Sequence, residues 1–106
     1  MNKLELEFHN KMEEIYFRAK DEIGYRATRF KQMVDVNGGR EAAIILLKSK
    51  DISYGFEELC LHNRQDLSME ALIVENIKFY SLFNKKEIKT ARKKLKESGY
   101  IPKKKF

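Results

Sequence analysis

The chain has 106 residues, of which 42% are hydrophobic and 36% are charged, and its formal net charge is +6. A chain of this length forms one domain that buries about two thirds of its unfolded surface. Its hydrophobic content is high enough for a folded core, which argues against a disordered chain. No apolar run approaches the roughly 20 residues that cross a bilayer, and no N-terminal signal segment is visible, so we expect no membrane association.

The first 24 residues carry a clear helical pattern. Apolar side chains recur within one third of a helical wheel, at Leu4, Phe8, Met12, Ile15, Ala19 and Ile23. Asn2 and Glu5 resemble a capping box at the start, and Gly24 predicts the end. Leu6 and Phe17 lie on the opposite side of the wheel. They form either a second internal packing surface, which is the preferred interpretation, or a contact with a partner.

A second helix is expected over residues 26–36, followed by a break at residues 37–39. Its apolar stripe consists of Ala27, Phe30, Met33 and Val34. Arg26 and Arg29 flank one edge of this stripe. Their guanidinium groups either extend past the apolar surface into solvent or pair with acids of the first helix, which we favour, or they contact an anion.

The central element is expected to be an apolar helix over residues 40–48. Residues 42–47 are all apolar, so no rotation of a helix gives them a polar face, and we expect them to be almost wholly buried. The preceding Gly38 and Gly39 could offer N–H groups to a phosphate. However, Glu41 already places a negative charge in the first turn, which favours a simple turn and helix cap.

Three more helices are expected after residue 50. Asp51 or Ser53 begins one that ends near residue 63, and Asp66 or Ser68 begins the next, which Asn76 interrupts before a short turn. The last helix is the best delimited. Asn84 and Glu87 mark its start, Gly99 marks its end, and its apolar stripe consists of Ile88, Ala91 and Leu95.

These patterns predict an all-α fold, a compact bundle-like domain of five to seven short helices packed around the central apolar helix. Residues 1–100 form a single helical domain and residues 101–106 a basic C-terminal tail. No alternating strand pattern and no internal repeat is present.

Several segments in order resemble a family of small bacterial proteins without an assigned activity. They are residues 19–20, 24–34, 38–39, 55–59, 66–72 and 82–83. The resemblance implies a compact, cytoplasmic, all-helical bacterial domain and brings no cofactor or site residue. The lysine-rich C-terminal end departs from it, so function placed there does not follow from the family.

The sequence offers little for catalysis or metal binding. Neither the pair His9 and Glu13 nor the pair Cys60 and His62 has enough companions for a zinc site or a positioned nucleophile. We therefore expect no enzyme activity, no cofactor and no metal. A lone cysteine forms no internal disulfide, fits a reducing cytoplasm, and is interpreted here as a small core residue.

The positive charge is concentrated at the C-terminal end. Residues 85–106 hold ten basic and two acidic residues, whereas residues 1–84 hold twelve basic and fourteen acidic ones. The candidate nucleic-acid contacts form one arc beside the apolar stripe of the last helix and continue into the tail: Lys85, Lys86, Lys89, Arg92, Lys93, Lys96, Lys103, Lys104 and Lys105. Such a band binds phosphate backbones through counterion release.

Two functions remain open from the sequence. The leading one is an accessory protein that contacts nucleic acid through the basic helix, and the alternative is a protein-interaction module with another bacterial protein as its partner. The alternative uses Leu6 and Phe17 or the same basic helix. A band of this kind is also compatible with simple solvation of a lysine-rich protein. Contact with an anionic membrane surface is a weaker alternative, because the apolar stripe is narrow and is expected to face the core.

Overall fold

The computed structural model describes residues 2–49 and 54–103, and everything below concerns these residues. Its helices are α1 (Lys3–Ile23), α2 (Thr28–Asn37), α3 (Gly39–Lys48), α4 (Tyr54–Leu61), η1 (Gln65–Leu67), α5 (Met69–Glu75), η2 (Ile77–Leu82) and α6 (Lys85–Glu97). No strand occurs within these two ranges, so the all-α prediction is confirmed.

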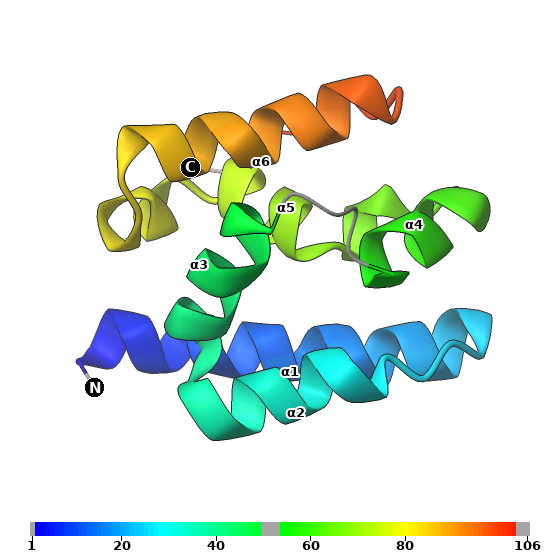
Figure 1. The fold of residues 1–106 in the computed structure, drawn as a ribbon, viewed down its shortest axis with the longest axis horizontal. Helices are drawn as coiled ribbons and strands as arrows, with labels where there is room; N and C mark the ends of the chain where they lie inside the picture. The colour runs from blue at the N-terminus through cyan, green and yellow to red at the C-terminus, as the bar shows by residue number, and fades with distance from the viewer. Residues whose placement is uncertain (1, 50–53, 104–106) are drawn as a thin grey trace.

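The helices form three layers (Figure 1). α1 and α2 lie side by side at the bottom of the view, α4 and α5 occupy the middle, and α6 covers the top. α3 runs across the layers and contacts α1, α2 and α6, so it links the first layer to the last. The apolar helix is therefore central, as the sequence indicates.

The start and end signals explain most boundaries. The Asn2 side chain accepts the Glu5 N–H at 2.8 Å, and Gly24 closes α1 with a φ of 69°. The Ser68 hydroxyl caps α5 by accepting the Ala71 N–H at 3.0 Å. α2 begins at Thr28 rather than at the expected Arg26, because Ala27 takes a non-helical conformation there. Asp51 and Ser53, the candidate caps of α4, lie outside the described residues.

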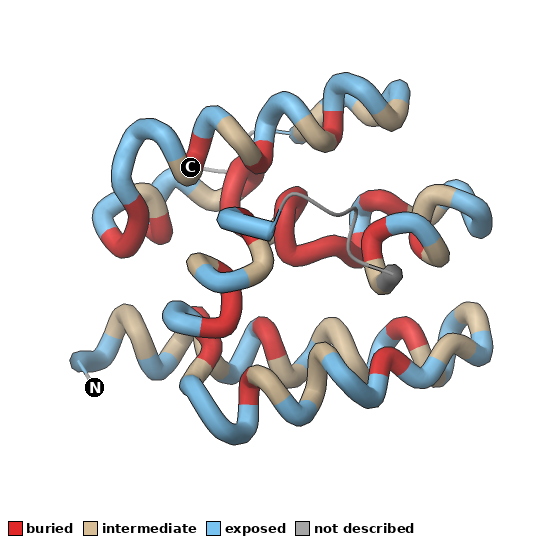
Figure 2. Tube along the Cα trace, viewed as in Figure 1, coloured by how far each residue is buried: buried red, intermediate tan, exposed pale blue. Residues whose placement is uncertain are grey.

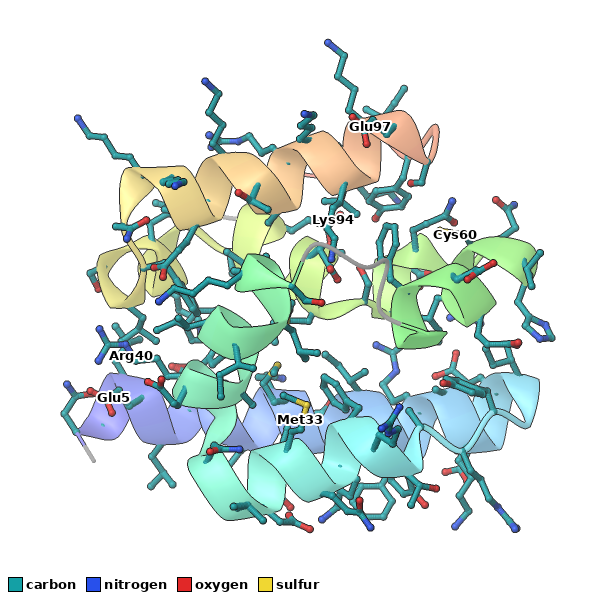
Figure 3. All side chains as sticks on the ribbon, viewed as in Figure 1. Glu5, Met33, Arg40, Cys60, Lys94 and Glu97 are labelled. Carbon is teal, nitrogen blue, oxygen red and sulfur yellow. The ribbon has the colours of Figure 1, made fainter. Side chains whose placement is uncertain are left out.

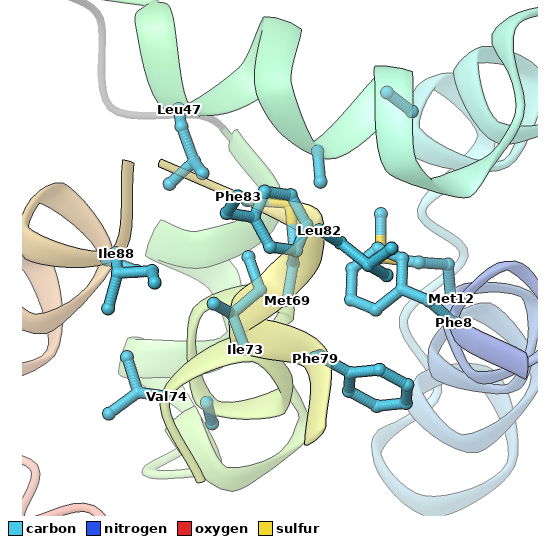
Figure 4. Close-up of a cluster of buried hydrophobic side chains, with 14 of the residues drawn as sticks. Phe8, Met12, Leu47, Met69, Ile73, Val74, Phe79, Leu82, Phe83 and Ile88 are labelled. Atoms are coloured by element: carbon cyan, nitrogen blue, oxygen red, sulfur yellow. The ribbon is translucent and has the colours of Figure 1, made fainter. Parts of the chain in front are cut away.

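The main core lies where α1, α3, α5, η2 and α6 meet (Figures 2 and 4). Phe8 of α1 is wholly buried and packs edge-on against Phe79 and Phe83, with ring centroids 5.1 and 5.2 Å apart. Ala91 and Leu95 bring α6 onto the same cluster. A smaller cluster of Ala19, Leu59 and Leu67 joins the far end of α1 to the middle layer.

The expected burial of residues 42–47 is only partly correct. Ala42, Ala43 and Leu47 are buried, but Ile45 is 41% exposed, and Ile44 and Leu46 are intermediate. The helix was expected to be covered on every side, but its contacts with α1, α2 and α6 leave Ile45 open to solvent. The apolar run therefore predicted that α3 is central, but it did not predict which side of α3 faces solvent.

The exposure of Leu6 and Phe17 differs from a second expectation. Both side chains lie on the outer side of α1 and are about half exposed, at 49% and 47%. They do not form the internal packing surface that the sequence favoured. The ring of Phe17 contacts only Tyr16 edge-on among the aromatic neighbours in the described ranges.

Candidate nucleic-acid interface

The basic face belongs to α6, whose two ends are tightly defined. At the start, the Asn84 side chain accepts the Glu87 N–H at 2.7 Å and the Glu87 carboxylate accepts the Asn84 N–H at 2.9 Å. At the end, Gly99 has a φ of 82°, and the Tyr100 N–H bonds back to the Leu95 carbonyl at 3.0 Å. This pairing of a capping box with a Schellman ending holds α6 at a fixed length.

The apolar stripe of α6 then sets its rotation. Ile88, Ala91 and Leu95 are 8% exposed or less and face α3 and α5. Because the stripe is docked, the opposite side of the helix must face solvent (Figure 3). The exposed basic residues on that side are Lys85, Lys86, Lys89, Arg92, Lys93 and Lys96. We call these six residues the α6 basic band.

The side chains of four members of the band have no hydrogen-bond or ion-pair partner among the described residues: Lys85, Lys86, Lys89 and Lys96. Lys93 lies 3.9 Å from Glu97, and both side chains are largely exposed, so this pair is weak. Arg92 is more ordered, since its guanidinium donates to the Tyr80 hydroxyl at 3.0 Å and lies over that ring. The band therefore presents mostly unneutralised charge.

The neighbouring Lys94 is turned inward. Its Nζ lies 3.1 Å from the Oε2 of Glu70, a residue that is only 2% exposed, and 5.7 Å from the centre of the Phe56 ring. Figure 3 shows Lys94 on the side of α6 that faces the middle layer. The Lys94 side chain is thus largely buried. This agrees with the sequence analysis, which did not include Lys94 among the candidate nucleic-acid contacts.

The start of the tail is fixed by a second buried carboxylate, that of Glu75. Its Oε2 accepts the Tyr100 hydroxyl at 2.6 Å and the Lys103 N–H at 2.8 Å. Burial, followed by the hydrogen bond to Glu75, raises the pKa of the Tyr100 hydroxyl, which stays protonated as a donor. The Lys103 side chain is exposed, and Lys104 and Lys105 lie outside the described residues.

The other candidate residues have local roles. The Nδ1 of His9 accepts the Gly39 N–H at 2.9 Å, and its Nε2 lies 2.7 Å from Glu13, so His9 holds the start of α3 against α1. The Arg40 guanidinium donates to the Leu82 carbonyl at 2.8 Å. With these donors engaged, the start of α3 is a turn and a cap, as the sequence favoured.

Arg26 and Arg29 are not paired with the acids of α1, and of the two arrangements that the sequence favours they show the other one, extension into solvent. Both are exposed, and neither side chain has a hydrogen-bond or ion-pair partner in the described part of the chain. Instead, both line the edge of a large groove beside α2. No local sequence pattern indicates this groove, because its walls come from separate segments of the chain.

Cys60 and His62 do not form a reactive pair. Cys60 packs against the main core and is partly buried, and burial raises the pKa of its thiol. His62 is exposed and lies 3.9 Å from Glu58. Within residues 2–49 and 54–103, no group of three His, Cys, Asp or Glu side chains could hold a metal ion, and no helix is long and apolar enough to cross a membrane.

Comparisons of the chain with protein-family models, with curated proteins and with solved structures found no significant match.

Proposed function

We propose that this protein is a non-enzymatic cytoplasmic accessory protein of bacteria that binds nucleic acid through the phosphate backbone, using the α6 basic band. The observation that carries the proposal is the band itself. Six cationic side chains lie on the solvent side of one docked helix, and five of them have no acidic partner among the described residues.

The geometry of α6 suits a phosphate backbone. From Lys85 to Lys96 the band extends about 16 Å at the helical rise of about 1.5 Å per residue. A duplex carries one negative charge per roughly 1.7 Å of its axis, so about ten phosphates lie within this length. Five of the six residues are lysines, which bind phosphate as point charges and read no base sequence.

Salt-dependent binding to random duplex DNA and to RNA tests the proposal. A protein that uses the band should lose affinity steeply as salt rises, and replacing Lys89, Lys93 and Lys96 by Gln should reduce the salt slope by about three. A matched control replaces Lys3, Lys20 and Lys48 by Gln, which removes the same charge from α1 and α3. The control should keep the wild-type slope.

The competing function is a protein-interaction module, and one observation favours it. Leu6 and Phe17 leave about half of their apolar side chains exposed on the outer side of α1. If the wild-type protein binds neither DNA nor RNA at low salt, the nucleic-acid proposal fails. Equal slopes for the two triple variants would also contradict it, because they would place the affinity outside α6.

A further inference from the structure

A groove lies between the α1–α2 layer and the middle layer. Its volume is about 750 Å³, and its walls come from α1, α2, α3, α4 and the start of α5. This size falls within the roughly 300–1,000 Å³ of ordinary small-molecule sites. The groove is separate from the α6 basic band, since no residue of the band lines it.

The walls of the groove are mainly apolar. Its principal apolar side chains are Ala19, Ala27, Phe30, Met33, Phe56 and Leu59. Met33 points from α2 toward the middle layer (Figure 3), and Met69 contributes from the other wall. Because methionine is unbranched and polarisable, these two side chains adapt readily to a flexible apolar ligand.

The described lining of the groove contains two basic residues and one acidic residue, which differ in exposure and in pairing. Arg26 and Arg29 both line the groove, and both are exposed with no side-chain hydrogen-bond or ion-pair partner among the described residues. Among the described residues of the lining, the single acid is Glu70, which is buried and already neutralised by Lys94 at 3.1 Å. The groove therefore combines an apolar interior with two free positive charges. A guanidinium matches a carboxylate through two parallel hydrogen bonds.

We infer that this groove binds a monomeric alkyl carboxylate, with the chain between α2 and the middle layer and the carboxylate at Arg26 and Arg29. An anionic head satisfies the two arginines, and an unbranched chain needs only apolar contact from the walls. This site is independent of the nucleic-acid proposal, because it involves other residues on another face.

The methionine methyl groups provide a direct assay on the full-length protein. Met33 and Met69 line the groove, whereas Met12 is buried in the main core and does not. In a methyl NMR titration with decanoate, the signals of Met33 and Met69 should shift and that of Met12 should not. Across hexanoate, octanoate and decanoate, affinity should rise about fourfold per added methylene. No shift, or an equal shift of Met12, would overturn the inference.

The head group is tested in the wild-type protein and in a variant. Decanol and decyltrimethylammonium should bind about tenfold or more weakly than decanoate, since neither offers arginine a negatively charged, two-oxygen acceptor. Arg26→Gln with Arg29→Gln should abolish this difference, while Lys85→Gln with Lys89→Gln, which removes the same charge from α6, should preserve it. Equal binding of all three amphiphiles would exclude a carboxylate site. Binding to phosphatidylglycerol vesicles without binding to decanoate would assign the groove to a membrane surface instead.

Discussion

The Nζ of Lys94 lies 3.1 Å from the Oε2 of Glu70, and the two side chains are only 16% and 3% exposed. This ion pair joins α6 to α5 at the inner side of the basic helix. Replacing one member of a buried pair leaves the other charge unpaired and poorly solvated, which is costly. Lys94 therefore has a structural role, whereas the lysines of the α6 basic band are exposed.

The first prediction compares two adjacent lysines. Lys94→Met should lower the free energy of unfolding by about 3–5 kcal/mol, because Glu70 is left buried without a partner. Lys93→Met, at a largely exposed position, should change it by less than about 0.5 kcal/mol. Urea denaturation followed by circular dichroism measures both.

A double variant tests the cause. Adding Glu70→Gln to Lys94→Met removes the unpaired charge and should recover part of the lost stability. If Lys94→Met costs no more than Lys93→Met, the ion pair does not stabilise the packing of α6 on α5.

The sequence predicted the ends of helices well because the signals for them are local. The capping box at Asn84, the Ser68 cap and the glycine at position 24 all appear in the structure where the residues indicate them. The rotation of α3 could not be predicted. Six consecutive apolar residues carry no periodicity, so only tertiary contacts decide which side faces solvent.

The second prediction follows from that rotation. Leu47→Ala should cost about 2–5 kcal/mol, since Leu47 is buried in the main core. Ile45→Ala should cost less than about 1 kcal/mol, because Ile45 is 41% exposed and leaves little cavity. Thermal unfolding of the two variants distinguishes this arrangement from a fully buried α3, for which the two costs would be equal.

The candidate site was predictable in part for a similar reason. The exposed band follows from the wheel of α6, because its apolar stripe is short and clear. The groove beside α2 does not, since its lining combines residues far apart in the chain, such as Ala19 and Phe56. No local pattern in either segment indicates that the other lies opposite.

The third prediction concerns two helical glycines. A Cβ at Gly39 would lie 2.6 Å from the Cα of His9, and backbone there cannot move without separating α1 from α3. Gly39→Ala should therefore destabilise the protein by about 1–3 kcal/mol.

Gly55→Ala is the matched control. Among the described residues, its Cβ would meet only the Tyr25 hydroxyl at 4.0 Å, so the higher helix propensity of alanine should stabilise the protein by about 0.5–1 kcal/mol. Destabilisation of both variants to the same degree would contradict the close contact.

The fourth prediction concerns the reactivity of Cys60. Burial raises the pKa of its thiol, so less of the reactive thiolate is present at neutral pH than in the unfolded chain. A disulfide reagent such as dithiobis-nitrobenzoate should label the native protein much more slowly than the protein in urea. Native labelling as fast as that of the unfolded chain would show that the thiol is open to solvent and activated.

The last prediction concerns acid. Arg64 donates to Glu22 of α1 at 2.8 Å and to Asp66 of η1 at 2.9 Å, and these hydrogen bonds hold the pKa of both carboxyls below their ordinary values. A lowered folded pKa contributes stability above the unfolded pKa, and that contribution is lost as pH falls through the folded value. The wild-type protein should therefore exceed Arg64→Gln in stability at pH 7, and the difference should shrink below about pH 4.5. Urea denaturation at pH 7, 5 and 3 measures this difference.

Lys48→Gln is a control with the same change of charge. Lys48 has no carboxylate partner in the described ranges, so the difference in stability between this variant and the wild type should stay constant with pH. A difference for Arg64→Gln that is constant with pH would show that the two carboxylates do not depend on this arginine.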